Sequence, residues 1–194
     1  MNTGKLKRFI INKLESELSD KLIYHGVHHT LHVLKSCNQY IKRMYIGTHD
    51  AYLLRTAALM HDTGFIWDFD NHENESIDYT AKLLPDWNYS NDEIDKIVGM
   101  INATKKPQTP STTLEQILAD SDLDYLGTKY FYKIGNKLYK ELLAYNKIST
   151  EEDWDKIQVQ FLRDHHYHTP FAIKFREPVK QNYLKEILDK WGWK

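Results

Sequence analysis

The sequence predicts an all-α protein, a single compact multi-helix bundle over residues 1–194. Apolar residues recur at intervals of three and four, as in Leu6, Phe9, Ile10 and Leu14, which is the spacing of one face of a helix. No stretch alternates apolar and polar residues as a half-buried strand does. Helix-breaking residues separate the periodic segments without a linker of domain scale, and 194 residues suit one well-buried domain.

The composition is that of a soluble globular protein, with 41% hydrophobic and 27% charged residues. Lys and Arg total 26 against 27 Asp and Glu, so no global basic field favours nucleic acid, and we expect no nucleic-acid partner. Cys37 is the only cysteine, which excludes an intrachain disulfide and fits a reducing compartment. We find neither a signal-peptide pattern nor an apolar run long enough to span a bilayer, so we expect a cytoplasmic protein without membrane association.

The first third of the chain predicts three helices. Leu6, Phe9, Ile10, Leu14 and Leu18 mark the buried face of the first. Gly26 marks a break, after which a second helix runs to Gly47. The buried face of this second helix is expected to comprise Val33, Leu34, Ile41, Met44 and Tyr45. A third helix runs from about Asp50 to His61.

The middle of the chain predicts three more helices. A fourth extends from about His72 to Leu84 and stops at Pro85. Ser90–Glu93 has the pattern of a helix N-cap and begins a fifth. After the linker between Pro107 and Pro110, Ser111 or Thr112 begins a sixth helix, which delivers Asp120-Ser121-Asp122.

The last third predicts a long helix from about Tyr130 to Tyr145 and a further one capped by Ser149–Glu152. Trp154, Ile157, Phe161 and Leu162 are expected on the buried face of the latter. Pro170 and Pro178 bound the last turns before a closing amphipathic segment that ends near Trp191.

Side chains that ligate metals gather at helix ends in four places: His25/His28/His29, His61-Asp62, His72 and Asp120/Asp122. Each follows or begins an apolar helical stretch, so each can reach the interior. A buried His-Asp pair is costly unless something balances the carboxylate, and a divalent cation does so directly. An isolated His-Asp pair more often lies at the end of a helix with both side chains hydrogen-bonded to the protein. Four places with metal-ligating side chains in one small helical protein nevertheless favour a metal site.

These residues carry a family resemblance. Tyr24-His25-Gly26-Val27-His28-His29-Thr30, Leu59-Met60-His61-Asp62-Thr63-Gly64 and Leu118-Ala119-Asp120-Ser121-Asp122-Leu123 resemble the H…HD…D pattern of the HD-domain metal-dependent phosphohydrolases. The likeness covers about residues 22–127, and residues 128–194 are expected to complete the bundle, as in small stand-alone bacterial members. It implies an HD-domain-like bundle that binds a divalent metal.

The resemblance implies that His29, His61, Asp62 and Asp122 are the metal ligands. Asp120 also matches part of the motif, so the choice between Asp120 and Asp122 stays open, with Asp120 otherwise facing the substrate. Two imidazoles and two carboxylates suit Mn²⁺, Mg²⁺, Fe²⁺, Co²⁺, Ni²⁺ or Zn²⁺, and the sequence does not choose among them. Because Asn102 stands where a two-metal site would place another histidine, we expect one ion per chain.

The resemblance also implies the catalytic and substrate-binding residues. His25 matches the histidine that protonates the leaving oxygen in cyclic-nucleotide phosphodiesterases, although Gly26 stands where those enzymes usually have Asn, and His25 can instead cap the turn. His72 matches a position that contacts substrate or a second metal. Candidates for contact with the phosphorylated substrate are Lys105, Lys106, His165, Thr169 and Arg176, for which a solvated surface is the alternative.

The function that follows is hydrolysis of a phosphate ester or anhydride of a small metabolite, with a nucleotide favoured, by a metal-activated water. A non-catalytic nucleotide-sensing module that retains the metal is the main alternative, and a di-iron oxygenase of the same fold would need ligands that the chain lacks near Asn102. The oligomeric state is left open, and a homo-oligomer is compatible with the sequence.

Overall fold

The computed structural model describes residues 3–194, and every regular element in that range is helical, so the all-α prediction is confirmed. Residues 1 and 2 of the expected domain lie outside the described residues. Among residues 3–194, no helix is both long and apolar enough to cross a membrane.

The α-helices are α1 (Thr3–Glu17), α2 (Val27–Arg43), α3 (Thr48–Met60), α4 (His72–Leu83), α5 (Asn91–Asn102), α6 (Thr113–Asp122), α7 (Phe131–Ala144), α8 (Glu151–Asp164), α9 (Pro170–Phe175) and α10 (Glu177–Trp191). Three short 3-10 segments are η1 (Thr63–Ile66), η2 (Leu84–Trp87) and η3 (Asp124–Gly127).

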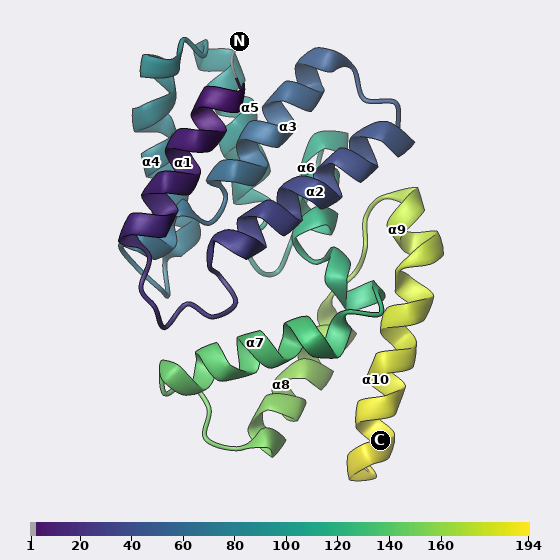
Figure 1. The fold of residues 1–194 in the computed structure, drawn as a ribbon. Coiled ribbons are helices and arrows are strands. Elements are labelled where there is room, and N and C mark those ends of the chain that lie inside the picture. Colours follow the sequence, from purple (N-terminus) through teal and green to yellow (C-terminus); the bar gives the residue numbers. More distant parts are fainter. Residues whose placement is uncertain (1–2) are drawn as a thin grey trace.

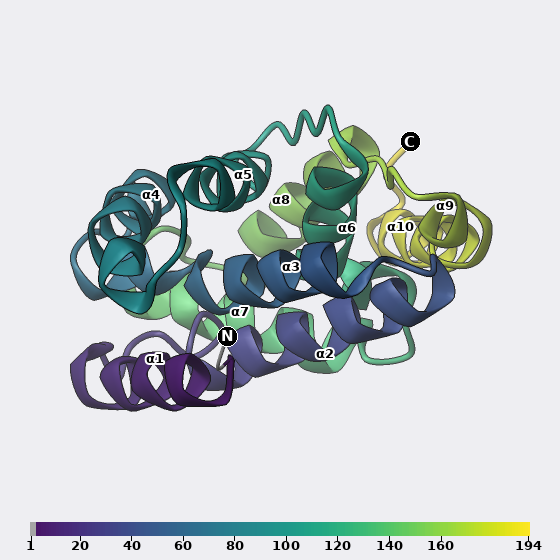
Figure 2. The same cartoon turned by 90° about the horizontal axis from the view of Figure 1, so that it is seen from above.

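Helix α3 lies at the centre of the first six helices and packs against α1, α2, α5 and α6 (Figures 1 and 2). Its sequence is apolar on nearly all sides, and both Leu53 and Leu54 are fully buried. The first turn of α3 is exposed, but from Thr56 to Met60 every residue is buried, so the end of the helix can place polar side chains deep in the protein. The end of α3 carries His61 and Asp62.

The last four helices form a second group beside the first (Figure 1). Helix α10 packs on both α8 and α9, and η3 joins this group to α6. Arg176 donates hydrogen bonds to Asp124 over 2.7 and 3.2 Å, which fixes the start of α10 against η3. Gly127 allows the approach, because a Cβ there would lie 2.5 Å from the Arg176 carbonyl oxygen.

The helix starts expected at Ser90, Thr112 and Thr150 are confirmed. Each of these side chains accepts a hydrogen bond from the backbone N–H three residues on, and the acidic residue there accepts one from the N-cap N–H in return. Such reciprocal caps satisfy two otherwise unpaired donors at a helix start. They explain why these boundaries were readable from sequence.

Two expectations about the second and eighth helices were wrong. Helix α2 ends at Arg43 rather than Gly47, and Tyr45 is 93% exposed with a left-handed φ of 54°. The turn closes because the Ile46 N–H donates to the Ile41 carbonyl over 3.1 Å, and Gly47 instead precedes α3 as its N-cap. On α8, Ile157 is 45% exposed although its spacing matches the buried face.

Removal of the α5 cap should lower the stability of the fold. We expect Ser90→Ala to reduce the free energy of unfolding by about 1 kcal/mol, because the Glu93 N–H loses its acceptor at 3.3 Å. Urea denaturation followed by circular dichroism measures the change. Ser149→Ala is the matched control, since this exposed serine has no side-chain hydrogen bond in the described structure. Equal stability of the two variants would contradict the assignment of Ser90 as the cap.

Candidate metal centre and adjoining cavity

Four side chains from three helices meet at one point. His29 lies in the first turn of α2, His61 and Asp62 follow the last turn of α3, and Asp122 ends α6. His29 Nε2 is 3.0 Å from Asp122 Oδ1 and 3.2 Å from Asp62 Oδ2. His61 Nε2 is 3.2 Å from Asp62 Oδ2, 3.6 Å from Asp122 Oδ1 and 3.4 Å from His29 Nε2. The structure thus brings together the four residues predicted to bind a metal.

The adjacent residues His61 and Asp62 face the same point because the helix ends between them. Neighbours in a continuous helix point about 100° apart. His61 keeps helical angles of −57° and −33°, whereas Asp62 adopts −112° and 11° and leaves the helix. Thr63 then donates its hydroxyl to the Met60 carbonyl over 2.8 Å and begins η1. This turn directs the Asp62 carboxylate back toward the His61 ring.

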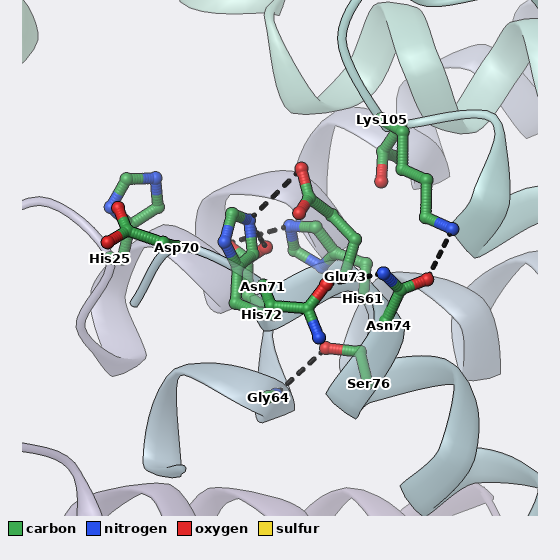
Figure 3. A network of polar contacts seen from close by, with 12 residues as sticks. His25, His61, Gly64, Asp70, Asn71, His72, Glu73, Asn74, Ser76 and Lys105 are labelled. Carbon is green, nitrogen blue, oxygen red and sulfur yellow. Dashed lines mark hydrogen bonds and ion pairs between the residues drawn. The ribbon is translucent and has the colours of Figure 1, made fainter. Parts of the chain in front are cut away.

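Gly64 lets the start of α4 approach this turn. A Cβ on Gly64 would lie 1.9 Å from the His72 carbonyl oxygen, so only glycine fits, and its N–H donates to Ser76 Oγ over 2.8 Å (Figure 3). His72 is thereby held beside the cluster, with its Nε2 4.0 Å from Asp62 Oδ1 and 3.4 Å from Glu73 Oε1. Its Nδ1 donates to the Phe69 carbonyl over 3.1 Å, which leaves Nε2 with the lone pair.

The donor atoms of the cluster fit a divalent cation. His61 Nδ1 donates to the Ala58 carbonyl over 3.0 Å, so in the neutral ring the Nε2 lone pair faces the carboxylates. Asp62 Oδ2 is buried and accepts no well-aligned hydrogen bond, although both imidazole Nε2 atoms are 3.2 Å away. The ligand atoms of His29, His61 and Asp122 lie within 4.8 Å of one another. A cation among these atoms would satisfy the orphaned oxygen and balance the buried charge.

The pKa of each of the four groups depends on the charges of the others. Burial by itself raises the pKa of Asp62, but the imidazoles of His61 and His29 lower it well below its usual range. The pKa of Asp122 is lowered in the same way, by hydrogen bonds from the two histidines that outweigh burial. Burial opposes charge on His61, yet the carboxylates raise its pKa well above the ordinary value. The carboxylates thus favour positive charge on the two imidazoles, and a divalent cation at the same point would supply two positive charges.

His25 precedes α2 and lies beside the cluster, where a carboxylate from α7 holds it. Glu141 is fully buried, and its Oε2 accepts the backbone N–H groups of Tyr24 and His25 over 2.7 and 3.0 Å. Its Oε1 contacts His25 Nδ1. The other face of the ring stacks on Phe65, with the centroids 4.2 Å apart. Burial lowers the pKa of His25, and the Glu141 hydrogen bond opposes that decrease.

Glu141 was not among the residues predicted from sequence. The available signal is that it lies three residues after Leu138 and seven after Ile134, so it interrupts the apolar stripe of α7. A glutamate in such a stripe is buried only with a partner. The sequence gives no means of seeing that the partner is the Tyr24-His25 turn, more than 100 residues earlier.

Asp120 and Asp122 have separate positions. Asp120 is fully buried, and its two oxygens accept the backbone N–H groups of His168 and Thr169 over 2.9 and 2.8 Å. Burial raises its pKa to about 6, against the hydrogen bonds from Thr169 and His168. Asp120 thus ties the segment before α9 to α6, while Asp122 faces the histidines. The catalytic role predicted for Asp120 has no contact in this arrangement to support it, and it stays a prediction.

Of the two adjacent lysines, Lys106 faces the site. Lys105 Nζ donates to Asn74 Oδ1 over 2.6 Å, and Figure 3 shows its side chain directed there. Lys106 lines the cavity described below, with Nζ 5.1 Å from the centre of the Phe161 ring. Its place at the cavity wall suits it to contact an anionic substrate.

The other three predicted substrate contacts do not line the cavity described below. His165 is buried, with its Nδ1 3.3 Å from Lys180 Nζ. Thr169 is fully buried as the N-cap of α9, and Arg176 is paired with Asp124. Their roles in substrate binding stay predictions.

A cavity of about 250 Å³ opens beside the cluster. Asp62, Asp122, His25 and His72 line one end, and residues of α7 and α8 line the other. The metal centre therefore has an adjoining space in which a small molecule can bind.

Comparison with known proteins relates the chain to one family. Residues 26–124 match the family model described as HD domain. One solved structure, described as a predicted HD superfamily hydrolase from an uncultured Thermotogales bacterium, resembles this chain with a TM-score of 0.58 and 19% identity. The match covers 95% of this chain and 92% of that chain, and at this identity it shows a shared fold. None of the curated proteins compared matches the chain.

Replacement of Asp120 by Asn should affect folding rather than metal content. An amide offers one acceptor oxygen, so one of the His168 and Thr169 N–H groups would face an NH₂ group, at a cost of about 1–3 kcal/mol in unfolding free energy. Urea denaturation measures this cost, and elemental analysis of the purified protein measures bound metal. Asp122→Asn, two residues further along α6, is the comparison and should lose metal instead. Loss of metal from Asp120→Asn at unchanged stability would show that the two roles are reversed.

Proposed function

The chain belongs to the HD-domain family, whose model matches residues 26–124, and from this premise we propose that it is a metal-dependent phosphohydrolase. The proposed reaction is hydrolysis of a phosphate ester or anhydride of a small metabolite. The nucleotide substrate suggested by the resemblance stays a prediction.

One observation carries the proposal. Each of two imidazole nitrogens lies 3.0 to 3.6 Å from an oxygen of each of two carboxylates, and the buried Asp62 Oδ2 has no aligned donor. In a polar cluster that serves only to stabilise the fold, the buried polar atoms usually have hydrogen-bond partners. His29, His61, Asp62 and Asp122 would hold the ion, and their nitrogen and oxygen donors allow several divalent metals. When bound, such an ion polarises a phosphoryl oxygen and lowers the pKa of water.

The residues around the ligands can position and protonate a substrate. His25 is oriented by Glu141 and stacked on Phe65, and its ring lines the cavity next to the carboxylates. To protonate the leaving oxygen, the His25 ring must carry protons on both nitrogens. Burial opposes this protonated state and Glu141 favours it. His72 lines the same end of the cavity, and Lys106 can offset the charge of the phosphate.

A single ion per chain is the arrangement that we propose. Near Asn102, where an additional histidine would extend the site, Thr104 and Lys106 line the cavity instead. His72 Nε2 lies 4.0 Å from Asp62 Oδ1 and is suited to contact the substrate. The described residues contain one group of three or more side chains whose ligand atoms are mutually close enough for an ion.

Loss of a ligand should abolish both bound metal and activity. We expect His61→Ala and Asp62→Asn each to hold less than about a tenth of the wild-type metal, because even an outer-shell partner is worth about 10- to 100-fold in affinity. Elemental analysis measures the metal, and phosphate release from a panel of esters and nucleotides with Mn²⁺, Mg²⁺, Co²⁺ and Ni²⁺ measures activity. The helical circular dichroism spectrum should persist.

The matched controls are His28→Ala and Asp20→Asn, at exposed positions outside the cluster. Both should retain metal and turnover. Phosphatase activity in a demonstrably metal-free variant of His61 or Asp62 would refute the proposed function.

Replacement of Glu141 by Gln should lower kcat on the order of 10- to 100-fold while metal content stays the same. The amide oxygen can still accept the Tyr24 and His25 N–H groups, but its NH₂ group would face His25 Nδ1 and no longer favour the protonated ring. Since Glu141 raises the pKa of His25, its loss lowers that pKa. The decline of activity at alkaline pH should therefore move to lower pH.

Steady-state kinetics over a range of pH tests this prediction. Glu15→Gln, the same change at an exposed position of α1, is the control and should leave the profile unchanged. Wild-type kcat and pH dependence in Glu141→Gln would show that Glu141 supports only the fold and that His25 is not the acid.

A further inference from the structure

The cavity beside the metal centre has two chemically different ends. Toward the centre it is lined by the charged or titratable groups of Asp62, Asp122, His25 and His72, with Phe65 stacked on both histidine rings, and Lys106 also lines the cavity. The other end is formed by α7 and α8, which lie side by side beneath the central helices in Figure 1. A substrate that fills the cavity therefore presents its phosphate to one environment and its organic part to another.

The α7–α8 end is almost wholly apolar. From α7 it is lined by Phe131, Leu138 and Leu142, and from α8 by Trp154, Ile157 and Phe161. Gln158 is the one residue of these two helices that brings an amide or charged group to the cavity. Its Nε2 already donates to Asp155 Oδ1 over 2.8 Å. The acids and bases of α7 and α8 do not line this end, so it offers almost nothing to pair with buried polar atoms.

On this evidence, and resting on the proposed function, we propose that the substrate is a phosphate ester of an apolar alcohol, whose hydrocarbon part binds between α7 and α8. A ribose and a nucleobase would bring hydroxyl, amino and carbonyl groups into this space, and such groups are unfavourable in an apolar site without partners. A hydrocarbon group has no hydrogen bonds to lose there, and its transfer from water into the apolar site is favourable.

The size of the cavity limits the alcohol to a small one. Its volume is about 250 Å³ including the polar end, and an apolar cavity of about 150 Å³ can hold benzene. One ring or a short branched chain beside a phosphate group therefore fills the space. Lys106 Nζ lies 5.1 Å from the Phe161 ring centre, so its ammonium can reach a phosphate joined to a hydrocarbon that packs on that ring.

The partial exposure of Ile157 agrees with this assignment. It is 45% exposed although it follows the apolar spacing of α8, and it lines the cavity. A bound hydrocarbon would cover this side chain. A substitution of Ile157 should therefore change the preference between apolar and polar substrates. Ile157 is not one of the proposed metal ligands.

The test uses only phosphate esters of alcohols, whose leaving groups are similar. A difference in turnover then reports binding of the organic group rather than leaving-group quality. Wild-type protein with the metal that gives the highest turnover is assayed on benzyl phosphate, isopentyl phosphate, glycerol phosphate and adenosine monophosphate. We expect kcat/KM to be at least about 10-fold higher for the first two, the smallest discrimination that one hydrophobic contact gives. Equal or higher values for glycerol phosphate or the nucleotide would overturn the inference and leave the phosphohydrolase proposal standing.

If no ester is hydrolysed, the phosphohydrolase proposal fails, and binding still decides the nature of the cavity. Benzylphosphonate and glycerol phosphate are then compared by calorimetry on the metal-loaded protein. Tighter binding of benzylphosphonate supports an apolar ligand, and equal or weaker binding overturns it.

A pair of variants locates the effect. Ile157→Gln should lower the ratio of kcat/KM for benzyl phosphate to that for glycerol phosphate by about 10-fold, because it places an amide in the apolar end. Ile173→Gln, at an isoleucine on α9 that is 51% exposed and outside the cavity, should keep the wild-type ratio. An unchanged ratio in Ile157→Gln at unchanged metal content would show that the hydrocarbon does not bind between α7 and α8.

Discussion

The structure depends on holding two buried carboxylates, Asp62 and Asp122, against two imidazoles at the meeting point of three helix ends. Carboxylates in a protein interior are unfavourable unless positive charge lies beside them. Here the lowered pKa values of both acids show that each is stabilised in its charged form by His29 and His61. Helix α2 must begin, and α3 and α6 must end, where these four groups can touch, and this requirement fixes how the helices cross.

The helices after η3 do more than cover this centre. They provide Glu141, which holds His25 from α7. The segment before α9 provides the backbone N–H groups of His168 and Thr169, which donate to Asp120. They also form the apolar end of the cavity. The family match ends at residue 124, so His29, His61, Asp62 and Asp122 lie in the matched part, whereas the residues of α7 and α8 that line the cavity lie beyond it. This division explains how a shared centre can serve different substrates.

Much of this arrangement was readable from the sequence. Apolar spacing and capping residues such as Ser90 predicted the helices, because both act within a few residues along the chain. The meeting of His29, His61, Asp62 and Asp122 could be anticipated because helix ends and the family motif coincide at His61 and Asp62, while their role as metal ligands stays a prediction. One error was local, since the turn after α2 closes before Gly47, and the other two features that were missed depend on distant segments. Glu141 reaches the Tyr24-His25 turn, and Ile157 faces a cavity instead of a packed partner.

A crystal of the protein grown or soaked with Mn²⁺ gives the most direct test of the central claim, since anomalous scattering locates the ion independently of any assay. The account predicts one strong peak, with His29 Nε2, His61 Nε2 and oxygens of Asp62 and Asp122 as its protein ligands. A peak elsewhere, or an Mn²⁺-saturated crystal with hydrogen-bonded imidazole and carboxylate pairs and no ion at this point, would contradict it.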